Sequence, residues 1–209
     1  TVAAWLLRGT GYRPSDLSIL YESVPLQSHA AFTVEMDEPG EAEARNVLGI
    51  LPGADPERAD ELLILGAHYD HLGTDANGDV YAGANDDASG VAALLEVARS
   101  GPGAGYVPAV PVLFASWDSE EQGLLGAAHY AANPLMPLTQ TVGMIQLDMV
   151  GLASEGVLLV DGDLNPVGAQ LMASAGLFGV PAEGSGSDGG AGSDHAVFAR
   201  AGVDAALLI

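Results

Sequence analysis

The stretch Leu62-Leu63-Ile64-Leu65-Gly66-Ala67-His68-Tyr69-Asp70-His71 joins a continuous apolar run to a group of polar side chains. An apolar run of this length, without alternating polar residues, is typical of a strand that is covered on both faces of a sheet. His68 stands where the run ends. The stretch therefore predicts a buried strand with an imidazole at its carboxyl end.

Similar segments surround this strand and set the fold class. From residue 46 onward, predicted strands alternate with predicted helices, and the strand cores are apolar throughout. This pattern favours an α/β three-layer sandwich, in which a mostly parallel central sheet has helices on both faces. Strands are expected at 46–51 (also buried), 110–115, 142–147, 157–160 and 205–209, with helices at 2–8, 88–99, 123–132, 166–175 and 195–201, extended segments at 19–25 and 30–36, and loops at 54–61 and 184–192.

Composition bounds the class of protein. A chain of 209 residues is long enough for one well-cored domain, and we expect residues 1–209 to form a single domain. The formal net charge of −22 disfavours nucleic acid and anionic membranes as partners. The simplest explanation of the many acidic residues is that they keep the protein soluble. Adaptation to salt, or a structural Ca²⁺ bound at surface loops, are the alternative explanations. No apolar run reaches the ~20 residues of a membrane helix, and cysteine is absent, so no thiolate can bind a metal.

Four more short motifs follow in fixed order: Asn85–Gly90, Asp118–Gly123, Gln146–Met149 and Ser193–His195. Several lie at the carboxyl ends of predicted strands, where α/β folds form their sites. Imidazole nitrogens and carboxylate oxygens suit zinc, and a two-metal site needs a bridging group with terminal ligands on each side. The candidates are six residues: His68, Asp86, Glu120, Glu121, Asp148 and His195.

Other polar residues carry weaker signals. A lone histidine is more often an ordinary residue than a ligand, so His29 and His129 are read in that way. His71 is either a pocket-wall residue or an ordinary loop residue. Asp87 and Asp194 are expected to be structural caps.

Over residues 45–209, the five motifs resemble the co-catalytic two-zinc aminopeptidases, a group that also contains glutamate carboxypeptidase II-like peptidases and the non-catalytic transferrin receptors. The resemblance implies that Asp86 bridges two Zn²⁺ ions. It pairs His68 with Asp148 on one ion and Glu121 with His195 on the other.

The same resemblance implies three further features. Glu120 matches the general base, and Asp70 matches a carboxylate that orients the imidazole of His68. A cis peptide is expected between Asp86 and Asp87. Residues 1–44 form an atypical amino-terminal segment, and the family usually continues beyond the position of Ile209. We therefore expect the chain to be an excised or truncated part of a longer product, in a secreted or periplasmic setting.

The expected activity is that of a zinc-dependent aminopeptidase acting on a peptide with a free amino terminus. A hydroxide bridging the two ions would attack the peptide carbonyl, with Glu120 moving the proton. A carboxypeptidase, a glutaminyl cyclase and a metal-binding domain without catalysis are the alternatives. The sequence leaves the oligomeric state open.

Overall fold

The computed structural model describes residues 43–152, 156–190 and 192–209, which belong to one compact unit, Glu43–Ile209. The helix expected at 2–8 and the extended segments expected at 19–25 and 30–36 lie outside the described residues. The single-domain organisation of 1–209 therefore stays a prediction. Within the described ranges, no helix is long and apolar enough to cross a membrane.

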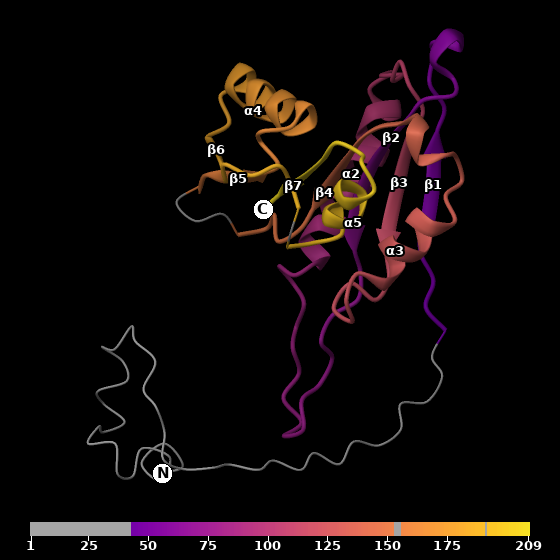
Figure 1. Cartoon of the computed structure of the whole chain (residues 1–209). Coiled ribbons are helices and arrows are strands. Elements are labelled where there is room, and N and C mark those ends of the chain that lie inside the picture. Colours follow the sequence, from indigo (N-terminus) through magenta and orange to yellow (C-terminus); the bar gives the residue numbers. More distant parts are fainter. Residues whose placement is uncertain (1–42, 153–155, 191) are drawn as a thin grey trace, which may run out of the picture. The chain divides into compact units, whose positions relative to one another are not determined.

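A seven-stranded sheet forms the centre of this unit (Figure 1). Its order is β1-β3-β2-β4-β7-β5-β6, and the four central strands β3, β2, β4 and β7 are mutually parallel. On one side, the edge strand β1 is antiparallel to β3; on the other, β5 is antiparallel to β7 and parallel to the edge strand β6. The mostly parallel sheet is thus confirmed. The strands are β1 (Val47–Leu51), β2 (Leu62–His68), β3 (Val112–Trp117), β4 (Thr141–Leu147), β5 (Leu158–Asp161), β6 (Ala182–Gly184) and β7 (Ala205–Leu208).

One face of the sheet is covered by α3 (Leu125–Ala132) and α5 (His195–Arg200). Alternate residues of β2 and β3, such as Ile64 and Leu113, are fully buried in this core. Trp117, Tyr130 and Phe198 pack their rings together there, with centroids 5.4 to 6.1 Å apart. This aromatic cluster anchors both helices beneath the carboxyl ends of the central strands.

The opposite face carries α2 (Ala88–Gly103) and α4 (Pro166–Phe178). Leu63 and Phe114 point away from the aromatic cluster and, together with Val97 of α2, line a cavity of about 370 Å³. The start of α4 follows from its sequence, because the Asn165 side chain accepts hydrogen bonds from the first-turn N–H groups and Pro166 fits the first helical position. Helices on both faces confirm the three-layer sandwich.

Some local expectations were wrong. The strand at 46–51 was expected to be buried, but β1 is an edge strand whose Val47 and Ile50 are 63% and 51% exposed. The helix expected at 88–99 continues through Pro102 to Gly103. The short strand β6 lies partly in the expected glycine-serine loop, and a 3-10 helix, Pro56–Arg58, interrupts the loop at 54–61.

The register of the sheet brings the polar motifs to one edge. His68 pairs with Trp117 across β2 and β3, and Gly66 pairs with Gln146 across β2 and β4. Asp118 and Asp148 therefore emerge level with the end of β2. Glycine is required at position 66, because a Cβ there would overlap the hydrogen-bonded side chains of Trp117 and Gln146. The three central strands thus deliver their following residues to a common site.

Candidate metal centre

His68 is the last residue of β2, and its side chain is only 1% exposed. Its Nδ1 lies 3.2 Å from the backbone oxygen of Asp70, which leaves Nε2 facing the other candidate ligands. Nε2 lies 3.0 Å from Asp86 Oδ1 and 3.8 Å from Asp148 Oδ2. His68, Asp86 and Asp148 therefore form one group whose ligand atoms converge.

Asp148 directly follows β4 and is held on two sides. Its backbone N–H donates to Leu208 O at 3.1 Å, and the buried hydroxyl of Ser193 donates to Oδ2 at 2.6 Å. Burial alone would raise the pKa of Asp148, but its interactions with His68 and Ser193 lower that pKa overall. The residue is therefore an oriented carboxylate, ionised at neutral pH.

Glu120 and Glu121 lie in the turn after β3, where the φ of Ser119 is 57°. The Asp70 carboxylate fixes this turn, because it accepts the backbone N–H of Glu120 at 2.9 Å and that of Glu121 at 3.1 Å. Asp70 was expected to orient His68 through its carboxylate, yet its Oδ1 is 3.6 Å from His68 Nδ1, farther than its backbone oxygen. Asp70 thus positions the glutamate pair as well as the imidazole.

The two glutamates point to different partners. Glu120 Oε2 lies 4.0 Å from His68 Nε2, while Glu121 Oε1 lies 2.8 Å from His71 Nδ1. Burial raises the pKa of Glu120 to about 7; His68 opposes this effect, and the charges of Asp148, Glu121 and Asp70 add to it. A carboxyl group with this pKa can both accept and return a proton near neutral pH.

Asp86 lies near both His68 and His71. Its Oδ2 lies 3.9 Å from His71 Nδ1, so that His71, Asp86 and Glu121 form a second convergent group. The expected cis peptide between Asp86 and Asp87 is present. Asp87 is the expected cap, since its carboxylate accepts the N–H of Gly90 in the first turn of α2. One residue, Asp86, is therefore shared by both groups.

His195 is the sequence-predicted ligand that the structure does not bring to either group. It begins α5 and is fully buried, with Nε2 3.1 Å from Asp161 Oδ2 on β5. The sequence reasoning missed Asp161 as its partner, and it missed His71 as a candidate ligand. The available signal for His71 was its position three residues after His68, at the same sheet edge.

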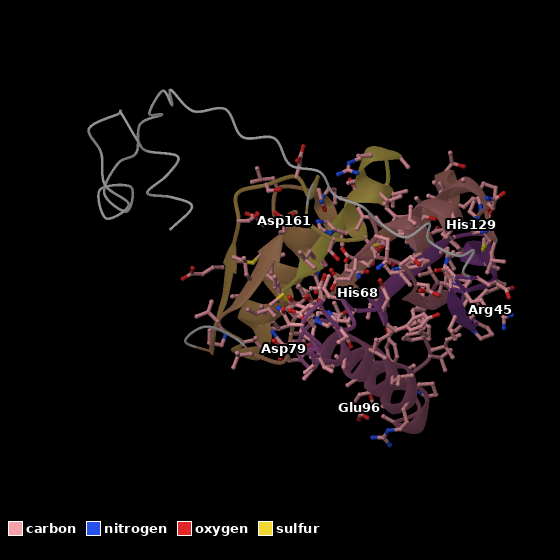
Figure 2. The ribbon with its side chains drawn as sticks, turned by 90° about the horizontal axis from the view of Figure 1, so that it is seen from below. Arg45, His68, Asp79, Glu96, His129 and Asp161 are labelled. Carbon is pink, nitrogen blue, oxygen red and sulfur yellow. The ribbon has the colours of Figure 1, made fainter. Side chains whose placement is uncertain are left out.

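Two histidines were expected to be ordinary residues, and one of them, His29, lies outside the described residues. His129 lies in the exposed part of α3 and belongs to neither group of ligand candidates. Figure 2 shows His129 and Arg45 on one side of the unit, well away from His68, with Asp161 on another. His129 is therefore an ordinary surface histidine, as expected.

The donor set fits zinc. Each group offers one imidazole and two carboxylates, which are common zinc ligands. His71 Nδ1 and Glu121 Oε1 are buried atoms without a hydrogen-bond partner, although they lie 2.8 Å apart. Buried polar atoms are almost always paired, so these two unpaired atoms, which converge with Asp86, fit a shared cation.

Comparisons with known proteins find similarity to zinc aminopeptidases. The chain is 35% identical over 161 residues to leupeptin-inactivating enzyme 1 of Streptomyces exfoliatus, covering 76% of this chain and 34% of that protein. The structure of BSAP, a zinc aminopeptidase from Bacillus subtilis, matches with 31% identity and a TM-score of 0.63 over 78% of this chain and 39% of that one. An aminopeptidase from Aneurinibacillus sp. strain AM-1 matches with 32% identity and a TM-score of 0.63, over 78% and 38%.

The chain thus spans about a third of the length of the curated relatives it matches. The family model for Peptidase family M28 matches residues 46–209, which is most of the chain and includes every candidate ligand described above. This match and the similarity to named zinc aminopeptidases lead to the same assignment. The chain belongs to Peptidase family M28.

Proposed function

We propose that this chain carries the catalytic site of a zinc-dependent aminopeptidase, which hydrolyses the peptide bond after the amino-terminal residue of its substrate. The observation that carries the proposal is the shared carboxylate of Asp86, which joins two groups of imidazole and carboxylate ligands at the carboxyl edge of a parallel sheet. The names of the related proteins support the aminopeptidase reading over a carboxypeptidase or a cyclase.

The residues of the two groups would hold two Zn²⁺ ions, with Asp86 between them. When bound, such ions act as Lewis acids on the peptide carbonyl and lower the pKa of water. His68, Asp148 and Ser193 form the buried side of this arrangement, and their mutual contacts keep the ligand oxygens and nitrogen oriented toward the site.

Glu120 is the proposed general base. Its backbone is fixed by Asp70, and its carboxylate points toward the buried side of the site. With a pKa of about 7, it takes the proton from the attacking water. The same carboxyl group then returns that proton to the nitrogen of the departing amine, so that no net proton is gained or lost by the protein.

A metal-binding domain without catalysis is the alternative from another class. The position of Glu120, whose Oε2 lies 4.0 Å from His68 Nε2, favours the enzyme, because a domain that only bound metal would not need a further carboxyl group beside the ligands. The peptide substrate with a free amino terminus, and the secreted or periplasmic location, remain parts of the proposal.

The experiment is hydrolysis of aminoacyl-nitroanilides by the purified, zinc-loaded chain. We expect hydrolysis that a chelator abolishes and that added Zn²⁺ restores, with no cleavage of the N-acetylated compounds. Peptides with a blocked carboxyl terminus distinguish the two peptidase classes. An aminopeptidase cleaves them, whereas a carboxypeptidase does not. Absence of chelator-sensitive hydrolysis in a chain that contains zinc would contradict the enzymatic proposal.

A further inference from the structure

The turn that follows β3 is held in place from two sides, and the proposed mechanism uses only one of them. Asp70 holds the turn on the side of the candidate metal centre, whereas Asp118, the first residue of the turn, faces the chain that enters β1. We propose that Asp118 is a positioning residue, whose carboxylate ties the turn to the loop after β2 and to the chain that enters β1, and thereby sets the place of the Glu120 carboxylate. This inference rests on the proposed function, because Glu120 is the proposed base of that reaction.

The carboxylate of Asp118 accepts hydrogen bonds from two other segments. Its Oδ2 accepts the backbone N–H of Arg45 at 2.7 Å. The hydroxyl of Tyr69 lies 2.8 Å from the same oxygen and 2.7 Å from the backbone oxygen of Arg45, so its one proton lies between two acceptors. Burial would raise the pKa of Asp118, but the hydrogen bonds that it accepts lower that pKa overall. Asp118 is therefore an ionised carboxylate, which makes these hydrogen bonds stronger than those to a neutral acceptor.

Asn46 makes a second connection between the start of β1 and the same turn. Its Oδ1 accepts the backbone N–H of Asp118 at 3.1 Å, and its Nδ2 donates to the backbone oxygen of Gly126 at 2.8 Å. The N–H of Gly126 in turn donates to the backbone oxygen of Asp118 at 3.0 Å. A Cβ at position 126 would overlap Asn46 Oδ1 and this backbone oxygen, so glycine allows α3 to approach the turn this closely. The backbone of Asp118 is therefore fixed at both its N–H and its oxygen.

The residues after Asp118 need this support because their backbone is unusual. Ser119 has a φ of 57° and Leu124 has a φ of 62°, in the left-handed region that residues other than glycine adopt only where surrounding contacts hold them. Glu120 lies between these two residues, and its N–H donates to Asp70 at 2.9 Å. Without the Asp118 carboxylate, the support on the side of β1 weakens, and Glu120 is no longer held in one position. A displacement of about 1 Å at a reacting group can lower the rate about 100-fold.

A purely structural role for Asp118 predicts a different result. Tyr69 is 45% exposed and Asp118 is half-buried, and hydrogen bonds in such places change stability only modestly. A structural role would lower Tm, and it would lower the rate by the same factor whether or not Glu120 is present. A positioning role acts through Glu120, so the effect of Asp118 should disappear once the Glu120 carboxylate is removed. A double-mutant cycle therefore separates the two roles.

The test measures kcat, KM and zinc content for the zinc-loaded chain with an aminoacyl-nitroanilide, and Tm by calorimetry. We expect Asp118→Ala to keep both ions and to lower kcat by about 10–100-fold with little change in KM. Asp118→Asn should recover most of the rate, because its amide oxygen can still accept hydrogen bonds from Arg45 and Tyr69. The matched control is Asp60→Ala, which changes an exposed aspartate before the amino end of β2 and should keep the full rate.

The second arm repeats the exchange in the Glu120→Gln protein, where Asp118→Ala should change the residual rate by less than about twofold. Tyr69→Phe removes one hydroxyl from the same contact and should lower kcat by a smaller factor than Asp118→Ala. Full activity of Asp118→Ala, an equal loss in both backgrounds, or a loss explained by missing zinc or unfolded protein would overturn the inference. An unchanged, zinc-loaded protein that hydrolyses nothing contradicts the proposed function and the inference with it, whereas a fully active Asp118→Ala contradicts the inference alone.

Discussion

The two groups of ligand candidates share Asp86 but are built differently. In the first group, His68 and Asp148 stand at the ends of strands β2 and β4, and their side chains are 1% and 10% exposed. In the second group, His71 and Glu121 lie in the loops that follow β2 and β3, and their side chains are 21% and 16% exposed. The sheet therefore positions one half of the centre, and loops position the other.

This difference has a physical consequence. Strand ends are fixed by the sheet, and Ser193 adds a hydrogen bond that orients Asp148. The loop residues lie outside the sheet ladder, and the Glu120 and Glu121 backbone is held by hydrogen bonds to the Asp70 carboxylate. We call His68 and Asp148 the strand-borne half of the centre, and His71 and Glu121 the loop-borne half. Because preorganised ligands lose less conformational freedom on binding, we expect the strand-borne half to bind its ion more tightly than the loop-borne half.

The largest expected effect comes from Glu120, the proposed general base. Glu120→Gln removes the proposed base while keeping its shape, so kcat should fall by about 10²–10⁴-fold. Both ions should stay bound, because the ligands of both groups remain. Steady-state kinetics with elemental analysis of the same samples measures both quantities. Loss of an ion in this variant would show that Glu120 is itself a ligand.

A second prediction tests the two halves against each other. Asp148→Asn and Glu121→Gln each remove one carboxylate ligand, and each variant should lose one ion per chain. The ion that remains in Glu121→Gln should bind more tightly than the one that remains in Asp148→Asn. Competition with a fluorescent zinc chelator measures both affinities. Equal affinities would contradict the proposed difference between the strand-borne and the loop-borne half.

The same difference explains how much could be predicted from the sequence. His68 and Asp148 were predicted as ligands because each directly follows an apolar run, and the structure brings them together. The parallel arrangement of β2, β3 and β4 was expected from the same runs, and the structure adds their register. The fold class and the strand-borne side of the site thus depend on a local pattern that is readable in the chain.

The loop-borne side depends on contacts that the pattern does not contain. The position of His71 is set by Tyr81 and Gly83, in a loop without hydrophobic periodicity. The partner of His195 is Asp161 on the distant strand β5, and only the order of the sheet brings that pair together. The exposure of β1 could not be predicted either, because an edge strand can have the same apolar composition as a central one.

A third prediction concerns the hydrogen bond that orients Asp148. Ser193→Ala removes the buried hydroxyl that donates to Asp148 Oδ2, and such supporting contacts typically change metal affinity by about 10–100-fold. The loss should fall on the strand-borne ion, with the other ion unaffected. Ser193→Thr keeps a hydroxyl and should restore much of the affinity. If both variants bound zinc as tightly as the unchanged protein, Ser193 would be no more than a packing residue.

The smallest expected effect is on stability, and it again separates the two halves. A ligand present at 100 times its Kd stabilises a protein by about 2.7 kcal/mol, which corresponds to a Tm increase of roughly 5–10 °C for a domain of this size. When zinc is added to the metal-free chain, the first equivalent should fill the tighter, strand-borne half. We therefore expect the first equivalent to raise Tm more than the second, as measured by scanning calorimetry. In Asp148→Asn the larger first step should disappear, whereas in Glu121→Gln it should remain, because the strand-borne ligands are still in place.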